Sequence, residues 1–248
     1  MKTIDTPTET GFLFPALPAL EPSPAALHNQ LLLRGLTHKL NNLLSVVKGN
    51  MGLLQMDDAL GPEGRNHIEE SKRACDLMAG LGDRIRACAG CSTPEITPVA
   101  AESVLLPLPN ALQRAAASKG IELQTHAAPA LPHVWADPGS LRDILSELVA
   151  NAIEASADGS IVSIQILAPG MWEPEQLSHV DVFVRNPSPA LSQKQILALF
   201  QPFHTSKGGN HSGTGLTLAL ALATQMGMPL GIRNTGQSTD VWLRLPVV

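Results

Sequence analysis

The spacing of apolar residues predicts a helical hairpin in the first part of the chain. From about Ala25, apolar positions recur at alternating steps of three and four, the spacing of one helix face. A turn over Asp57–Gly64, with Gly61-Pro62 as its breaker, is followed by a second helical stretch. The two seams are Leu33, Leu36, Leu40, Leu43, Val47, Asn50 and Leu54, then Ser71, Ala74, Met78, Leu81, Ile85 and Cys88. We therefore predict an antiparallel helical hairpin over residues 25–92.

Two paired helices of this length cannot bury both seams by themselves. A second hairpin would cover them and complete a four-helix bundle. We expect a homodimer, although the second hairpin could also belong to another protein.

The pattern changes after a linker at Ala89–Pro98, which contains one glycine and two prolines. Helices and strands then alternate in an irregular order, which predicts an α+β fold: an α/β sandwich with helices covering one face of a sheet. The predicted strands are Ile121–Thr125, Ile161–Leu167, Val180–Val184 and Asp240–Leu245, and the predicted helices are Pro138–Ala157 and Gly213–Met226. We assign residues 93–248 to this domain. Residues 1–24, with five prolines, are predicted to form a flexible or extended arm.

Composition narrows the possible classes of protein. Hydrophobic residues make up 44% and charged residues 16%, which indicates a folded protein with a core. The formal net charge of -5 gives little attraction to a phosphate backbone, so we expect no nucleic acid partner. Apolar runs are broken before the length of about 20 residues that a membrane span requires. The polar start does not resemble a secretory signal, so we expect a cytoplasmic protein without a membrane span.

The three cysteines, Cys75, Cys88 and Cys91, do not describe a disulfide framework. Cys88 and Cys91 have the spacing of a redox pair or of half a zinc site. Because no second pair of Cys or His residues lies nearby in the sequence, we interpret them as two unrelated thiols near a helix end.

Three polar residues of the predicted helix Pro138–Ala157 fall on one ridge. Asp143, Glu147 and Asn151 are four residues apart. A solvated helix face would also show this pattern, but an Asn in mid-helix has no propensity reason to be there. An amide oxygen beside a carboxylate is a suitable ligand set for Mg²⁺ that bridges phosphates.

Two further segments suggest a phosphate site. Phe200 and Phe203 precede a polar, glycine-rich stretch, as in a mobile lid hinged on a packed base. Gly213-Thr214-Gly215 opens an apolar helix, where backbone N–H groups and the helix dipole favour a phosphate. An ordinary surface loop or flexible connection would share these features, and no Gly-Lys-Ser/Thr closes a P-loop.

These segments, in this order, resemble the conserved boxes of the histidine kinase/gyrase/chaperone ATPases over about residues 131–248. The resemblance implies a domain that binds ATP and Mg²⁺, with Asn151 as the metal ligand and Glu147 as the acidic residue one turn before it. Asp137-Pro138 matches the entry to that helix. Phe200–Lys207 resembles the root of an ATP lid. Further implied nucleotide contacts are Lys207, Gly213, Thr214, Gly215 and Leu216.

The first glycine box departs from the family pattern. The usual Asp-x-Gly-x-Gly falls on Asn186-Pro-Ser188-Pro-Ala190, so the adenine amino group meets a neutral acceptor in place of a charged one. Ser188 and Ala190 replace glycines, the prolines stiffen the loop, and Thr217 stands where the second box usually has glycine. We expect ATP to bind with reduced affinity.

The first helix carries a segment that resembles the His box of histidine kinases, from Leu36 to Ser45. A single His is usually an ordinary surface residue, but here the resemblance implies that His38, exposed opposite the seam, is the phosphoacceptor. It also implies that Asn42, one turn on, influences phosphatase activity. Lys39 stands where the family has an acid that acts as base, so we expect slow autophosphorylation.

The resemblance as a whole implies a homodimeric histidine kinase of a two-component system. It would move the ATP γ-phosphoryl to His38 and then to an aspartate on a response regulator receiver domain. We expect the signal to come from a separate sensor protein, because the arm is too short for a sensor domain. Two alternatives stay open: a phosphotransferase or phosphatase of response regulators with degenerate kinase activity, and a non-catalytic pseudokinase scaffold.

Overall fold

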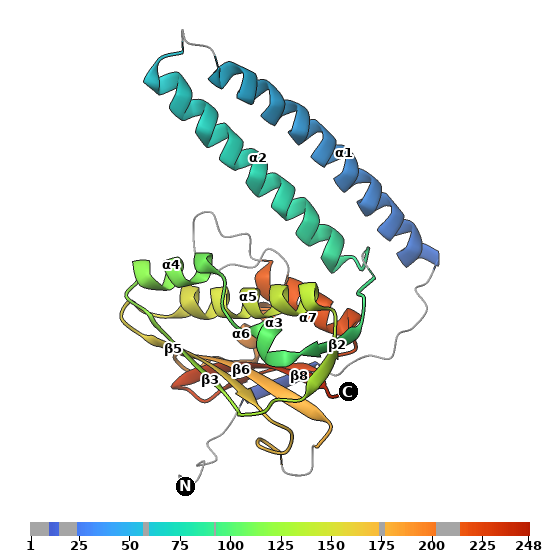
Figure 1. Ribbon diagram of the computed structural model, residues 1–248, viewed down its shortest axis with the longest axis vertical. Helices are drawn as coiled ribbons and strands as arrows, with labels where there is room; N and C mark the ends of the chain where they lie inside the picture. Colours follow the sequence, from blue (N-terminus) through green and yellow to red (C-terminus); the bar gives the residue numbers. More distant parts are fainter. Residues whose placement is uncertain (1–9, 15–23, 57–59, 92, 174–176, 202–213) are drawn as a thin grey trace. The chain divides into compact units, whose positions relative to one another are not determined.

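The computed structural model describes residues 10–14, 24–56, 60–91, 93–173, 177–201 and 214–248. They form two compact units, shown in Figure 1. The first, the hairpin, lies within Glu21–Ser92 and contains α1 (Pro24–Gln55) and α2 (Pro62–Cys88). The second, the sheet domain, contains the described residues of Thr93–Val248 together with Thr10–Phe14. A helical hairpin followed by an α+β domain is the fold that the sequence predicts.

The face of α1 that packs on α2 differs from the predicted seam. Thr37 and Leu44 are buried on α1, and Ile68, Cys75 and Gly82 are buried on α2. In both helices these positions are seven residues apart, the repeat of knobs-into-holes packing. A Cβ on Gly82 would lie 3.0 Å from the Thr37 methyl carbon, so the helices approach closely there.

Most seam residues of α1 instead remain exposed, although Leu40 Cδ2 lies 3.8 Å from the Cβ position on Gly82 of α2. We call this surface the leucine stripe. Leu36 is 61% exposed and Leu43 is 66% exposed, and the hairpin alone does not cover them. The stripe consists of Leu36, Leu40, Leu43, Val47 and Leu54.

The sheet domain is built on a six-stranded sheet with the order β1-β7-β8-β6-β5-β3. Neighbouring strands are antiparallel, except that β3 and β5 run parallel. The bounds are β1 (Thr10–Phe14), β3 (Glu122–Ala127), β5 (Ile161–Leu167), β6 (His179–Pro187), β7 (Leu230–Asn234) and β8 (Ser238–Pro246). The strands predicted within β5, β6 and β8 are therefore confirmed.

Within the predicted flexible or extended arm, Thr10–Phe14 are extended and belong to the sheet. These residues form β1, an edge strand in which Thr10 pairs with Asn234 and Phe14 pairs with Leu230. Pairing with β7 satisfies the backbone N–H and C=O groups of the segment. A strand of five residues in a proline-rich context gives too short a pattern to detect from the sequence.

The shorter elements were not predicted. They are a two-stranded sheet of β2 (Thr97–Ala100) and β4 (His133–Ala136), and the helices α3 (Ala101–Leu105), α4 (Asn110–Ser118) and α6 (Gln193–Ala198). None of these helices is longer than nine residues, so none shows three full turns of periodicity.

The two long helices of the domain, α5 (Pro138–Ala155) and α7 (Gly215–Gln225), lie on one face of the sheet (Figure 1). Asp137 caps α5, because its Oδ1 accepts the Ser140 N–H at 2.7 Å. At the other end, Lys119 Nζ donates to the carbonyls of Ile153 at 3.0 Å and Ser156 at 2.9 Å. Both ends of the helix are therefore satisfied within the domain.

The opposite face of the sheet carries a second, aromatic layer. The Trp242 ring lies directly over Gly231, where a Cβ would be 2.2 Å from ring carbon Cζ2. The Arg244 guanidinium lies 4.9 Å from the Trp172 ring centroid and 5.4 Å from the Trp242 centroid. Both faces of the central strands are thus covered.

Across the described parts of the chain, no helix has the length and apolarity needed to cross a membrane.

Candidate functional site

The polar ridge of α5 and the glycine-rich start of α7 meet in the sheet domain. Gly215 is the first residue of α7, and a Cβ built on it would lie 2.7 Å from Glu147 Oε2 and 2.8 Å from Asn151 Nδ2. Contacts this short are not found for real side chains. The position therefore requires glycine for space, and two motifs that are far apart in the sequence form one site.

Asn151 is held in place by its own helix. Its Nδ2 donates to the Glu147 carbonyl at 2.7 Å, one turn earlier. This bond fixes the amide so that Oδ1 is the acceptor, 3.4 Å from the Cβ position on Gly215. Glu147 and Asn151 are half-buried, whereas Asp143 is exposed, so only two members of the predicted ridge face α7.

The oxygen atoms of Glu147 and Asn151 lie beside the N-terminus of α7. A carboxylate and an amide oxygen are ligands that Mg²⁺ accepts, and the first backbone N–H groups of a helix attract phosphate. The donor set therefore fits a magnesium–phosphate group. Among the described residues, no group of three or more His, Cys, Asp or Glu side chains could hold a metal ion by itself.

Thr217, which replaces a usual glycine, has a structural partner. Its hydroxyl donates to the Phe200 carbonyl at 3.0 Å. Phe200 is buried and follows the C-cap residue of α6, a helix whose capping box joins Ser192 and Gln195. Thr217 thus anchors α7 to the base of the predicted lid. The predicted contacts Lys207 and Gly213, like Phe203, lie outside the described residues.

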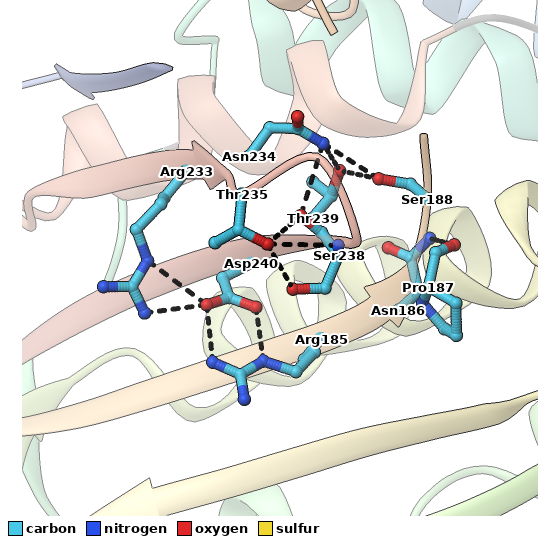
Figure 2. Close-up of polar contacts among 10 residues, drawn as sticks. All are labelled: Arg185, Asn186, Pro187, Ser188, Arg233, Asn234, Thr235, Ser238, Thr239 and Asp240. Carbon is cyan, nitrogen blue, oxygen red and sulfur yellow. Dashed lines mark hydrogen bonds and ion pairs between the residues drawn. The ribbon is translucent and has the colours of Figure 1, made fainter. Parts of the chain in front are cut away.

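The altered first glycine box begins at the end of β6 and lies beside the turn between β7 and β8 (Figure 2). Asn186 is 5% exposed, and its Nδ2 donates to the Pro187 carbonyl at 3.0 Å. Ser188 N donates to the Gln237 carbonyl at 3.0 Å, and Ser188 Oγ lies 2.6 Å from Thr239 Oγ1. The Ala190 methyl is 3.7 Å from the Cβ position on Gly236. The side chains that replace glycine therefore pack against this turn.

Asn234 and Thr239, which sequence reasoning missed, complete this region. Both are buried, and Asn234 Nδ2 lies 3.0 Å from Thr239 Oγ1 and 2.9 Å from Ser188 Oγ. The only local signal was Asn-Thr-Gly at 234–236, which reads simply as a turn.

A buried ion cluster lies on the other side of these strands, also shown in Figure 2. Asp240 is fully buried and accepts from Arg185 Nε at 2.6 Å and from Arg233 at 2.8 Å. Burial alone would raise the pKa of Asp240, but the hydrogen bonds from both guanidinium groups outweigh it and lower the pKa. The cluster therefore keeps a charged carboxylate inside the domain.

Asp181, on the same face, shows the opposite balance. It accepts from Arg244 Nε at 2.8 Å, while Arg244 also bonds Glu173 at 3.0 Å. Burial raises the pKa of Asp181, and the single shared guanidinium only partly offsets it. The pKa of the carboxylate with two cation partners is thus lowered, whereas the pKa of the carboxylate that shares one cation is raised.

In the hairpin, His38 and Asn42 are exposed one turn apart on α1, and Lys39 is exposed beside them. Asn42 Nδ2 lies 3.4 Å from His38 Nδ1. An amide nitrogen can only donate, so this contact is a hydrogen bond in the tautomer that has the lone pair on Nδ1 and the proton on Nε2. Rotation of the amide would present its oxygen to an Nδ1–H and leave the lone pair on Nε2.

All three cysteines lie in the described residues, and none of them forms a disulfide. Cys75 is buried in the hairpin core, and Cys88 and Cys91 are half-buried at the end of α2.

An open hollow of about 580 Å³ lies in the sheet domain, between α4 and the edge strand β3, with Leu108, Ala116 and Leu123 in its lining. None of the predicted site residues lines this hollow.

Comparison with known proteins identifies the sheet domain. The family model described as histidine kinase-, DNA gyrase B- and HSP90-like ATPase matches residues 136–248. Sensor histidine kinase GacS of Pseudomonas protegens is 26% identical over 224 residues, 86% of this chain and 24% of GacS. A probable sensor histidine kinase of Mycobacterium tuberculosis is 31% identical over 173 residues, 68% of this chain and 42% of that protein. This chain thus spans less than half of either relative.

Solved structures share the fold. Full-length ShkA in complex with AMPPNP aligns with a TM-score of 0.73 and 24% identity, over 87% of this chain and 46% of ShkA. The Acinetobacter baumannii histidine kinase AdeS aligns with a TM-score of 0.58 and 13% identity, over 85% of this chain and 98% of the AdeS chain. Residues 136–248 therefore belong to the histidine kinase-, DNA gyrase B- and HSP90-like ATPase family, and together with the hairpin they form a catalytic core of the sensor histidine kinase type.

Proposed function

We propose that the chain is a homodimeric protein-histidine kinase of a two-component system. It transfers the γ-phosphoryl group of ATP to His38 and then to an aspartate of a response regulator receiver domain. The observation that carries this proposal is the contact of Gly215 with Glu147 and Asn151, because it joins a phosphate-attracting helix end to an oxygen pair suited to Mg²⁺.

The nucleotide would lie between the altered first glycine box and the start of α7. Asn186 accepts from the adenine amino group, Ser188 and Ala190 form the floor, and Thr214, Gly215 and Leu216 hold the phosphates with their backbone. Asn151 would hold Mg²⁺, which would offset the negative charge of the phosphates. Lys207 and Gly213 are the lid contacts proposed from the sequence.

The chemistry has two transfers. A neutral ring nitrogen of His38 attacks the γ-phosphorus, the bond to the bridging oxygen breaks, ADP leaves, and the ring loses its proton. An aspartate oxygen of the receiver domain then attacks the same phosphorus, and the N–P bond breaks. Glu147 is proposed as the acidic group of the ATP site, because no acidic residue directly follows His38 in the sequence.

Incubation of the full chain with γ-labelled ATP and Mg²⁺ tests the proposal directly. We expect an acid-labile, alkali-stable phosphate on the wild type and none on His38→Gln. Asn151→Asp keeps the size but changes the ligand set, so it should alter Mg-dependent ATP affinity in calorimetry. Unchanged binding of Mg-ATP by Asn151→Asp would place the metal elsewhere.

A second function is favoured by the surroundings of His38. Lys39 places an ammonium group where a base is needed, and Asn42 contacts the ring. Both features suit a protein that accepts phosphate from a regulator or promotes its hydrolysis, because a cation attracts the incoming phosphoryl anion. Label that moves from a phosphorylated receiver domain to His38 without ATP would support this function. If the protein carries out neither reaction, it is a non-catalytic scaffold.

Homodimerisation is proposed from the leucine stripe. A contiguous apolar surface of this kind is unusual on a monomer and is typical of an interface. A second copy of the hairpin would cover it and complete a four-helix bundle.

A further inference from the structure

Asn234, the last residue of β7, ties the altered first glycine box to the turn between β7 and β8 (Figure 2). Its side chain is 3% exposed. Oδ1 accepts the backbone N–H of Leu191 at 3.0 Å and that of Gly236 at 3.1 Å. One amide oxygen therefore joins the end of the box to the turn.

The amide nitrogen of Asn234 holds the middle of the box. Nδ2 lies 2.9 Å from Ser188 Oγ, 3.1 Å from the Pro189 carbonyl and 3.0 Å from Thr239 Oγ1, and it is 3.3 Å from the Ser238 carbonyl. Its two N–H groups thus serve four acceptors. Only a planar amide offers two donors and an acceptor at this size, so Asp, which can only accept when ionised, cannot replace it.

These bonds determine how Asn186 is presented. Asn186 pairs with Thr239 in the sheet, and Thr239 bonds both Ser188 and Asn234. Because Asn186 Nδ2 donates to the Pro187 carbonyl, its oxygen is the end of the amide directed away from Pro187. The backbone on both sides of Pro187 is thus held against β7 and β8 through Asn234.

We propose that Asn234 is the positioning residue for nucleobase recognition: it holds the first glycine box so that Asn186 Oδ1 accepts from the exocyclic amino group of adenine. This rests on the ATP site proposed above. A neutral acceptor bonds more weakly than a carboxylate, so its placement matters more. A prearranged acceptor loses less conformational freedom when the base binds.

Calorimetry on the full chain with Mg²⁺ tests this by comparing ATP with the ATP analogue that lacks the 6-amino group. We expect the wild type to prefer ATP about five-fold, the effect of one neutral hydrogen bond. In Asn234→Asp the preference should fall to about one, while the analogue binds within about two-fold of wild type. Asn110→Asp, the same change on an exposed position, should keep the wild-type preference.

The outcomes separate this proposal from the proposed function. If the wild type binds neither nucleotide, the ATP site itself is wrong and this proposal falls with it. If the wild type prefers ATP and Asn234→Asp keeps that preference, or weakens both nucleotides equally, only the positioning role is overturned. If Asn234→Asp does not fold, Ser188→Ala decides, since it removes one bonded hydroxyl: a reduced preference supports the role, and an unchanged one overturns it.

Discussion

The hairpin and the sheet domain differ in how far each completes its own core. In the sheet domain, side chains such as Ile144, Ile164 and Leu245 are fully buried, and even Asp240 has two cation partners. In the hairpin, Leu44 and Ile68 are among the few buried large apolar side chains that the structure describes, while the leucine stripe stays exposed. The same chain thus contains one self-sufficient unit and one whose apolar surface needs another molecule.

The difference follows from geometry. A sheet with helices on one face and aromatic residues on the other encloses side chains on all sides. Two helices share only one line of contact, so a second apolar line on either helix finds no partner within the hairpin. The energetics of the sheet domain should therefore respond to substitutions inside it, and those of the hairpin to protein concentration.

The largest expected effect is on the sheet domain. Asp240→Asn leaves Arg185 and Arg233 around a neutral group, and removing the buried carboxylate from these partly exposed guanidinium groups should cost about 3 kcal/mol. Denaturant unfolding of the full chain measures this loss, and the dimerisation constant should not change. Asp158→Asn, the same change at an exposed position, is the matched control.

The cost of Asp240→Asn should depend on pH with a definite sign. Because the pKa of Asp240 is lowered in the folded domain, its stabilisation is present above the unfolded value of about 3.9 and is lost as pH falls through the folded pKa. The difference in unfolding free energy between wild type and Asp240→Asn should shrink below pH of about 4. A difference that stays constant down to pH of about 2 would contradict this assignment.

The next effect would break the hairpin's association. Leu36→Glu with Leu43→Glu places charges on the leucine stripe, so the dissociation constant of the proposed dimer should rise by at least about 100-fold. Analytical ultracentrifugation across micromolar concentrations measures it. Leu177→Glu is the control, since Leu177 is 70% exposed in the sheet domain. A monomeric wild type would refute the dimer.

A smaller effect concerns the chemistry carried by the hairpin. Lys39→Glu supplies the missing acid beside His38, so the rate of autophosphorylation should rise about tenfold or more. Lys39→Gln removes the cation without adding a base and separates the two causes. If Lys39→Glu leaves the rate unchanged while His38 remains the labelled residue, the base comes from the sheet domain, with Glu147 the first candidate.

The smallest effect is local to α5. Asp137→Ala removes the helix cap that accepts from Ser140 and from the Glu95 N–H at 3.0 Å, and should cost about 1 kcal/mol. Thermal unfolding detects this change. An equal destabilisation by Asp143→Ala, on the exposed part of the same helix, would show that the cap has no special role.

The sequence alone determined the elements whose periodicity is long. The hairpin, α5, α7 and the strands β5, β6 and β8 were predicted because ten or more residues, or a clear alternation, repeat one pattern. It also identified Glu147, Asn151 and Gly215 as chemically unusual for their positions. These are properties of the local chain, which residue spacing and side-chain chemistry express directly.

Only the tertiary structure decided how distant segments meet. Three interactions join residues that are far apart in the sequence. They are the pairing of β1 with β7, the hydrogen bond from Thr217 to the Phe200 carbonyl, and the bonds from Asn234 to the first glycine box. The structure also decided which helix face packs on α2, since Thr37 and Gly82 fit together while most of the more apolar leucine stripe stays exposed. Close packing depends on the shapes of both packed surfaces, and the sequence pattern of one segment describes only its own surface.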